Sequence, residues 1–255
     1  MKISHKYNYH KLQLLKLIFF GLFLFGFSCS QSQKTIRYYP LEYKVIPAKT
    51  QNETKKPLLI LLHGFGSNED DLAEIFSNID SNLITVCLRA PIELSENRFA
   101  WYELSFKDGA VSDYNKEQAK ESLNAVRRFI KDFTKENNCN MNEVYLLGFS
   151  QGAMISLEFM ISNPELISGI VALSGKFSEN ISEKISTKAD YKHLSAFIGH
   201  GKSDKVVPIE YARKVKQILS ESEIRTSYHE YDAEHSITAD ELIEIRNWIK
   251  QELEK

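Results

Sequence analysis

A Gly-x-Ser-x-Gly motif spans residues 148–152 and places Ser150 between two glycines. Such short patterns also arise by chance, so the flanking sequence matters. An apolar stretch, Val144 to Leu147, precedes the motif, and an amphipathic stretch, Gln151 to Asn163, follows it without a gap. A strand that turns sharply into a helix needs glycine on both sides of the turn and holds the serine hydroxyl clear of the sheet. The pattern predicts that Ser150 is a nucleophile.

A serine hydroxyl is a weak nucleophile at neutral pH, so it needs a histidine base, and the histidine needs a carboxylate to orient it. Where a serine lies on such an elbow, the acid and then the histidine follow it along the chain. Asp204 and His235 satisfy this order, and each follows a predicted strand, where a parallel sheet gathers its site. We therefore predict a catalytic triad of Ser150, Asp204 and His235.

Several other titratable residues follow the serine and compete for these two roles: His193, His200, His229, Asp190 and Asp232. His200 precedes the predicted acid, which is the wrong order for a base. His193 and Asp190 come before a strand rather than after one, and His229 is expected inside a strand. Asp232 is too close in sequence to the predicted base to approach it from a neighbouring strand.

Upstream, the segment from Leu61 to Gly66 ends an apolar run and begins a loop. This is where a second donor to the oxyanion would come from, and we predict the backbone amide of Phe65. The first donor is the amide of the residue after the nucleophile, Gln151, which also opens a helix. His63, beside the glycine turn, is expected to be a hydrogen-bonded packing residue rather than a catalyst.

The elements that must position these groups alternate along the chain, since short apolar runs are followed by amphipathic helical patterns. Ile36 to Ile46 resembles an edge strand. The other predicted strands are Leu58 to Leu62, Leu83 to Leu88, Val144 to Phe149, Gly169 to Leu173, Ala196 to Ile198 and Arg225 to Tyr231. This pattern is typical of an α/β protein with a mostly parallel sheet and helices on both faces.

Apolar residues at helical spacing predict four covering helices. The stripes are Ala119, Leu123, Val126, Ile130 and Phe133; Ala153, Leu157, Met160 and Ile161; Ala212, Val215 and Leu219; and Leu242, Ile245 and Ile249. The first helix should end before Asn137. Thr238 and Glu241 have the spacing of a capping box, so the last helix should begin just beyond His235.

The first residues differ in kind from the rest of the chain. Basic side chains precede an apolar run from Leu17 to Phe27, which is short for a membrane span and fits the core of a signal peptide. Gly26 to Cys29 resembles a bacterial lipobox, although Gly26 stands where leucine is more usual. We predict a signal peptide over 1–28, lipidation at Cys29, a polar tether over 29–35, and an exported envelope lipoprotein. An uncleaved membrane anchor is the alternative.

Composition favours one catalytic domain, residues 36–255. A chain of 255 residues that is 43% hydrophobic can bury one substantial core. With 32 basic and 34 acidic side chains the net charge is −2, which disfavours nucleic-acid binding. Of three cysteines, Cys29 belongs to the leader, Cys87 lies in an apolar strand and Cys139 is expected in a polar loop, so no disulfide framework or metal cluster follows.

Four segments together resemble the phospholipase/carboxylesterase family of α/β-hydrolases, which includes acyl-protein thioesterases and lysophospholipases. They are Leu62 to Gly66 with Asp70 and Asp71, Arg89 to Pro91 with Trp101 and Tyr102, Gly148 to Met154, and Gly201 to Pro208 with His235. The resemblance covers about Leu58 to Trp248. Glu103 departs from it, since the family commonly has aspartate there, and this leaves the shape of that loop open.

The resemblance implies an α/β-hydrolase fold, with Ser150, Asp204 and His235 at the triad positions and Phe65 and Gln151 at the oxyanion positions. It implies no metal and no organic cofactor. Trp101 could line an acyl-binding groove or belong to the core, since aromatic side chains supply apolar surface in either place.

These features predict a serine hydrolase that cleaves carboxylic esters or thioesters through an acyl-enzyme. Only about twenty residues separate the strand ending near Ser174 from the one starting near Ala196, too few for a large cap domain. An open site for short or single-chain acyl substrates is expected. A serine peptidase of the same fold is one alternative, because a triad does not separate esters from amides. A non-catalytic envelope binding lipoprotein is the other.

Overall fold

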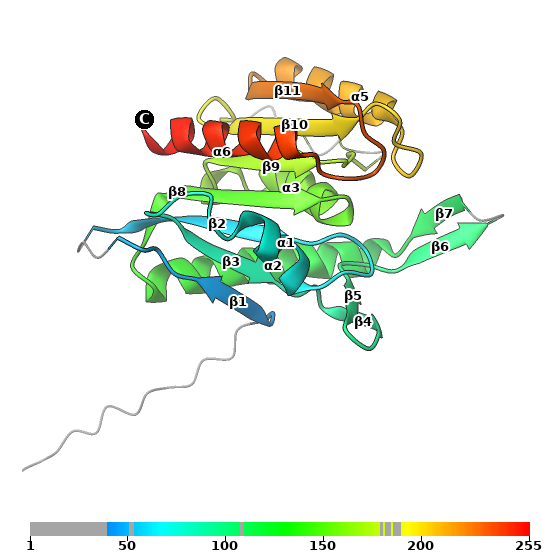
Figure 1. Cartoon of the computed structure of the whole chain (residues 1–255). Coiled ribbons are helices and arrows are strands. Elements are labelled where there is room, and N and C mark those ends of the chain that lie inside the picture. Colours follow the sequence, from blue (N-terminus) through cyan, green and yellow to red (C-terminus); the bar gives the residue numbers. More distant parts are fainter. Residues whose placement is uncertain (1–39, 51–53, 108–109, 179–180, 182–184, 186–189) are drawn as a thin grey trace, which may run out of the picture. The chain divides into compact units, whose positions relative to one another are not determined.

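In the computed structural model, seven strands form one central sheet in the order β1-β3-β2-β8-β9-β10-β11 (Figure 1). Their bounds are β1 Tyr43–Ile46, β2 Lys56–Leu62, β3 Ile84–Leu88, β8 Cys139–Phe149, β9 Gly169–Leu173, β10 Ser195–Gly201 and β11 Arg225–Tyr231. β1 is antiparallel to β3, and every other pair is parallel. The structure describes residues 40–50, 54–107, 110–178, 181, 185 and 190–255. The predicted mostly parallel α/β sheet is confirmed.

The central strands are buried on both faces, which explains their nearly continuous apolar sequence. All seven residues of β2 are buried. Leu58, Ile60 and Leu62 pack into one apolar cluster, whereas Leu59 and Leu61 pack into a second on the opposite face. The alternation of side chains along a strand therefore divides the core into two layers.

In the part of the chain that the structure describes, five helices cover these two layers (Figure 1). They are α1 Glu69–Phe76, α2 Lys116–Glu136, α3 Gln151–Ser162, α5 Ile209–Glu221 and α6 Ala239–Leu253. A 3-10 turn, Pro164–Leu166, follows α3. α1 and α6 contribute to the cluster around Leu59, and α2, α3 and α5 contribute to the other. The four predicted helices are confirmed, and so is the capping box of Thr238 and Glu241 at the start of α6.

Two hairpins and one helix between residues 69 and 114 were not predicted. The hairpins are β4–β5 (Ile92–Ser95 and Arg98–Ala100) and β6–β7 (Leu104–Lys107 and Ala110–Tyr114). Their strands are three to five residues long and lie outside the central sheet, so they lack the long apolar runs that reveal buried strands. α1 spans only two turns, and three acidic residues open it.

Two predictions about the strands need correction. The expected edge strand from Ile36 is the shorter β1, which starts at Tyr43, and residues 36–39 lie outside the described part. Cys139 does not lie in a polar loop, because it is buried and begins β8. Polar residues follow Cys139, so the apolar pattern that predicts a strand begins only several residues after the start of β8.

The predicted signal peptide, tether and lipidated Cys29 all lie outside the described residues. Among the helices that the structure describes, none has the length and apolar character needed to cross a membrane. β9 ends at Leu173 and β10 begins at Ser195, so the connection between them is too short for a large cap.

Candidate active site

Ser150 lies at the turn between β8 and α3 in a backbone conformation that is rare for serine. Its φ is 53° and its ψ is −113°. Such left-handed geometry in a residue with a Cβ is strained and persists only where neighbouring structure enforces it. Here the Ser150 amide donates to the carbonyl of Leu173 at 2.9 Å, which ties the turn to the end of β9.

The two flanking glycines are required by close backbone contacts. A Cβ on Gly152 would lie 1.9 Å from the carbonyl oxygen of Leu62, and a Cβ on Gly148 would lie 2.3 Å from the Gly152 backbone. Neither contact can be relieved by moving a flexible side chain. The glycines therefore let α3 start directly against β2 and β8, which leaves Ser150 half-buried at the carboxyl end of the sheet.

His235 and Asp204 meet Ser150 from loops after two other strands. His235 Nε2 lies 2.9 Å from Ser150 Oγ, and His235 Nδ1 lies 2.7 Å from Asp204 Oδ2. The second carboxylate oxygen, Asp204 Oδ1, accepts the backbone N–H groups of Val206 and Val207 at 2.9 and 2.8 Å. The three predicted side chains thus form one hydrogen-bonded line from carboxylate to hydroxyl.

The electrostatics of Asp204 favour its ionised form. Burial by itself would raise the pKa of this carboxyl, but the hydrogen bonds from His235 and from the amides of Val207 and Val206 outweigh it, and the pKa lies below its ordinary value. An ionised Asp204 fixes a proton on His235 Nδ1 and leaves Nε2 free to accept the hydroxyl proton of Ser150.

The competing residues lie at unsuitable places. Asp232 and Asp190 are exposed, and Asp232 pairs with Lys202. His193 is exposed and bonds the carbonyl of Pro164. His229 lies in β11, as expected, and stacks on Phe197 with ring centroids 4.8 Å apart.

His200, which was excluded as the base, lies in contact with Asp204. It is buried in β10, and its Nε2 donates to the carbonyl of Val207 at 2.7 Å and lies 3.4 Å from Asp204 Oδ2. Burial lowers the pKa of this histidine. Its Nδ1 has no hydrogen-bond partner among the described residues. His200 is therefore a neutral neighbour of Asp204. Its position four residues before Asp204 in the sequence could have indicated this contact.

The segments that carry the two predicted oxyanion donors both lie beside Ser150. A Cβ on Gly64 would lie 3.5 Å from Ser150 Cβ, so the loop that carries Phe65 runs beside the nucleophile. Gln151 is the first residue of α3, where backbone amides have no partner within the helix. No acceptor within the described part of the chain bonds either amide. The two amides can therefore donate to a group outside the chain.

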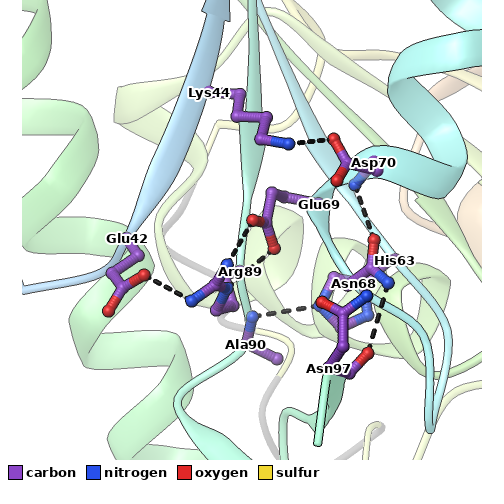
Figure 2. A network of polar contacts seen from close by, with 9 residues as sticks. All are labelled: Glu42, Lys44, His63, Asn68, Glu69, Asp70, Arg89, Ala90 and Asn97. Atoms are coloured by element: carbon purple, nitrogen blue, oxygen red, sulfur yellow. Dashed lines mark hydrogen bonds and ion pairs between the residues drawn. The ribbon is translucent and has the colours of Figure 1, made fainter.

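His63 has the packing role expected of it. Its Nε2 accepts the amide of Ala90 at 3.1 Å, so Nδ1 carries the proton and donates to the Gly64 carbonyl at 2.8 Å. Burial lowers the pKa of His63, in keeping with a neutral ring. The histidine thereby joins the loop after β2 to the loop after β3 (Figure 2).

Trp101 is fully buried, and its indole N–H donates to the His63 carbonyl at 2.9 Å. These contacts place Trp101 in the core, and the substrate contact expected of it stays a prediction. Glu103 is exposed and takes part in a bond with Gln118 at the start of α2. Among the described residues, no group of three His, Cys, Asp or Glu side chains is arranged to hold a metal ion.

A sequence model of the phospholipase/carboxylesterase family matches residues 41–253. The chain belongs to this family. The site described above lies within the matched region, and the α/β-hydrolase fold is the one that the sequence predicts. Membership makes the protein a carboxylic ester hydrolase.

The chain is similar to named proteins of a yeast and a plant. The chain is 32% identical to acyl-protein thioesterase 1 of Saccharomyces cerevisiae over 158 residues, which cover 60% of this chain and 69% of the yeast protein. It is 27% identical to carboxylesterase SOBER1 of Arabidopsis thaliana over 213 residues, which cover 78% and 91% of the two chains.

Solved structures share the fold. Esterase PE8 superposes with a TM-score of 0.72 at 24% identity, over 83% of this chain and 98% of that one. The Bacillus cereus carboxylesterase superposes with a TM-score of 0.71 at 20% identity, over 83% and 94% of the two chains. At these identities the likeness bears on the architecture alone.

Proposed function

We propose that this family member is a serine esterase and thioesterase that uses Ser150, His235 and Asp204 as its catalytic triad. The observation that carries the proposal is the hydrogen-bonded line of these three side chains at the carboxyl end of the sheet. The yeast relative named acyl-protein thioesterase and the plant relative named carboxylesterase support both classes of substrate.

In the first half of the reaction, Ser150 Oγ attacks the acyl carbonyl carbon while its proton moves to His235 Nε2. The carbonyl oxygen becomes negative and is held by the amides of Phe65 and Gln151. Collapse of the tetrahedral intermediate breaks the bond to the leaving oxygen or sulfur, which takes the proton from His235. An acyl-enzyme and a free alcohol or thiol result.

In the second half, His235 removes a proton from water as the water oxygen attacks the acyl-enzyme. Collapse returns the proton to Ser150 Oγ and releases the carboxylic acid. Asp204 stays ionised throughout and stabilises the imidazolium form of His235. The short connection between β9 and β10 leaves the site open, which suits substrates with one acyl chain.

The experiment compares wild type with Ser150→Ala on a chain-length series of p-nitrophenyl esters and matched thioesters. Ser150→Ala should lower kcat by several powers of ten while changing the melting temperature little. A fluorophosphonate probe should label wild type but not Ser150→Ala, and His235→Ala should lose labelling as well. Wild-type turnover by Ser150→Ala would overturn the proposal.

We also propose that the chain is exported and held at the envelope membrane through a lipid on Cys29. The basic start, the apolar run of residues 17–27 and the cysteine that follows support this. Mass spectrometry of the mature protein should find an N-terminal lipidated cysteine. An N-terminus at unmodified Met1 would rule out the lipid anchor and leave the proposed chemistry untouched.

A further inference from the structure

The two oxyanion donors come from different parts of the chain, so their separation must be set by something that joins them. Phe65 lies in the loop after β2, and Gln151 lies in the first turn of α3. A pair of donors stabilises a negative oxygen well only when both point at the place that it occupies in the transition state. An error of even a fraction of an ångström in one donor weakens that stabilisation.

The side chain of Gln151 forms the first part of such a connection. It is 2% exposed, so it does not reach the solvent or a substrate. Its Oε1 accepts the amide of Trp101 at 2.8 Å, and its Nε2 donates to the carbonyl of Tyr102 at 2.8 Å. Both ends of the amide group therefore hold the segment at residues 101–102 against the start of α3.

Trp101 completes the connection. Its indole N–H donates to the carbonyl of His63, two residues before Phe65. The Trp101 carbonyl in turn accepts a hydrogen bond from the hydroxyl of Ser122 in α2. Buried hydrogen bonds of Gln151 and Trp101 thus link the start of α3, which carries the Gln151 amide, to the loop that carries Phe65.

The rest of that loop is held by hydrogen bonds to β5, and the start of α1 that follows it is held by Arg89. The Gly66 amide donates to the Phe99 carbonyl at 2.8 Å, and the Phe99 amide donates to the Ser67 carbonyl at 2.8 Å. Arg89 makes two bonds to the buried carboxylate of Glu69 (Figure 2). With the loop fixed on its outer side, the Trp101 bond ties it to the segment that the Gln151 side chain holds against α3.

We propose that Gln151 and Trp101 are positioning residues that set the distance between the two oxyanion amides, Gln151 through its side chain and Trp101 through its indole N–H. This inference rests on the proposed function, since it assigns the same two amides to the oxyanion. It gives Gln151 a second task beside its backbone donor and gives Trp101 a role without substrate contact.

The test is Trp101→Phe, which keeps a buried aromatic ring and removes the N–H donor. The matched control is Trp248→Phe, because Trp248 is also buried but lies in the opposite core layer and has no hydrogen bond at its indole nitrogen among those described. We expect Trp101→Phe to lower kcat on a short p-nitrophenyl ester about 10- to 100-fold with KM nearly unchanged. Trp248→Phe should retain the wild-type kcat.

A boronic acid that forms a tetrahedral adduct with Ser150 supplies the second readout. Its affinity should fall in Trp101→Phe by the same factor as kcat/KM, because both depend on the oxyanion donors. A merely structural role would lower the melting temperature of both tryptophan variants and leave the boronate affinity of the folded enzyme unchanged. That result would overturn the proposal.

Ser122→Ala provides a second variant that should fold readily, since alanine is favourable in a helix. It removes the bond to the Trp101 carbonyl and should lower kcat and boronate affinity together by about threefold to tenfold. Unchanged values in Ser122→Ala and Trp101→Phe would sink the positioning role. If Ser150→Ala is inactive at the same time, the proposed function still stands.

Discussion

The two sides of the site are built in opposite ways. We define the base side as the Ser150 elbow together with the loops after β10 and β11 and the start of α6. This side holds groups in unfavourable states. Ser150 has a left-handed backbone, His200 Nδ1 lacks a partner among the described residues, and burial raises the pKa of Glu241 to about 7.

We define the oxyanion side as residues 63–69 together with residues 89–102. On this side the polar groups are instead satisfied by hydrogen bonds. Both ring nitrogens of His63 are bonded, and so are both ends of the Gln151 side chain that abuts this side. Arg89 binds two carboxylates, those of Glu69 and Glu42 (Figure 2).

The difference follows from what each side does in the proposed reaction. The base side must change protonation and bonding during turnover, so it holds groups that are not at their most stable. The oxyanion side must keep two amides still, which many satisfied bonds achieve. Relieving a strained group on the base side should therefore stabilise the protein, whereas removing a bond on the oxyanion side should destabilise it.

The largest effect is expected from Asp204→Asn. An amide cannot hold the proton on His235 Nδ1 as a carboxylate does, so the histidine adopts the wrong tautomer. Steady-state kinetics on a p-nitrophenyl ester should show kcat reduced by about 10⁴-fold, with little change in fold by circular dichroism. A loss smaller than about tenfold would contradict the assignment of the acid.

Two glycine variants compare backbone packing on the two sides. Gly152→Ala should lower the free energy of unfolding by about 3 kcal/mol or more, because the new Cβ would meet the Leu62 carbonyl. Gly66→Ala should lower it by only about 1–2 kcal/mol, since the φ of 73° is unfavourable but the nearest group is the flexible end of Arg98. Urea unfolding measures both, and equal losses would remove the distinction.

Glu241→Gln should stabilise the protein in a pH-dependent way. The folded pKa of Glu241 is raised to about 7, chiefly by burial, so its contribution to stability is present below the unfolded pKa and is lost as pH rises through 7. Glutamine preserves the capping box and carries no charge. The variant should gain at most about 3 kcal/mol over wild type at pH 8 and nothing near pH 4.

The control for this variant is Asp240→Asn, which removes an exposed carboxylate from the same helical turn. Its effect on urea unfolding should be small at every pH. If Glu241→Gln were less stable than wild type at pH 8, the buried charge of Glu241 would not be destabilising the base side.

Glu69→Gln should change the free energy of unfolding less than Glu241→Gln does, and with the opposite pH dependence. The Arg89 guanidinium holds the pKa of Glu69 below its ordinary value, so this carboxylate stabilises the fold above the unfolded pKa and ceases to do so as pH falls. Since Arg89 is partly exposed and keeps Glu42, we expect a loss of about 1–2 kcal/mol at pH 7. The loss should shrink toward pH 4.

Glu74→Gln, an exposed change in the same helix, is the control for this measurement. If Glu69→Gln and Glu241→Gln shifted unfolding in the same direction at pH 8, the contrast between the two sides would be wrong.

The base side could be predicted from the sequence because its determinants are local. A glycine-flanked serine between a strand and a helix fixes the elbow, and chain order then selects Asp204 and His235. The structure brings these three side chains within hydrogen-bonding distance, and their catalytic roles stay predictions. The long buried strands were equally clear, since apolar runs bounded by polar loops have few other interpretations.

The oxyanion side could be predicted only in part, because its bonds join residues far apart in the chain. Gln151 and Trp101 are 50 residues apart, and no periodicity reveals a side-chain amide bonded to a distant backbone. The short β4–β5 hairpin and α1 gave weak signals for the same reason. The ion pair of Glu69 with Arg89 could have been suspected, since opposite charges follow the neighbouring strands β2 and β3.

The burial of Cys87 and Cys139 has a practical consequence. Burial raises the pKa of these thiols to about 12 and about 11, so almost no thiolate exists at neutral pH. Maleimides and iodoacetamide should leave both untouched in the folded protein. With Cys29 replaced by serine, a cysteine introduced at the exposed position of Met141 would accept a single fluorophore and report unfolding without background labelling.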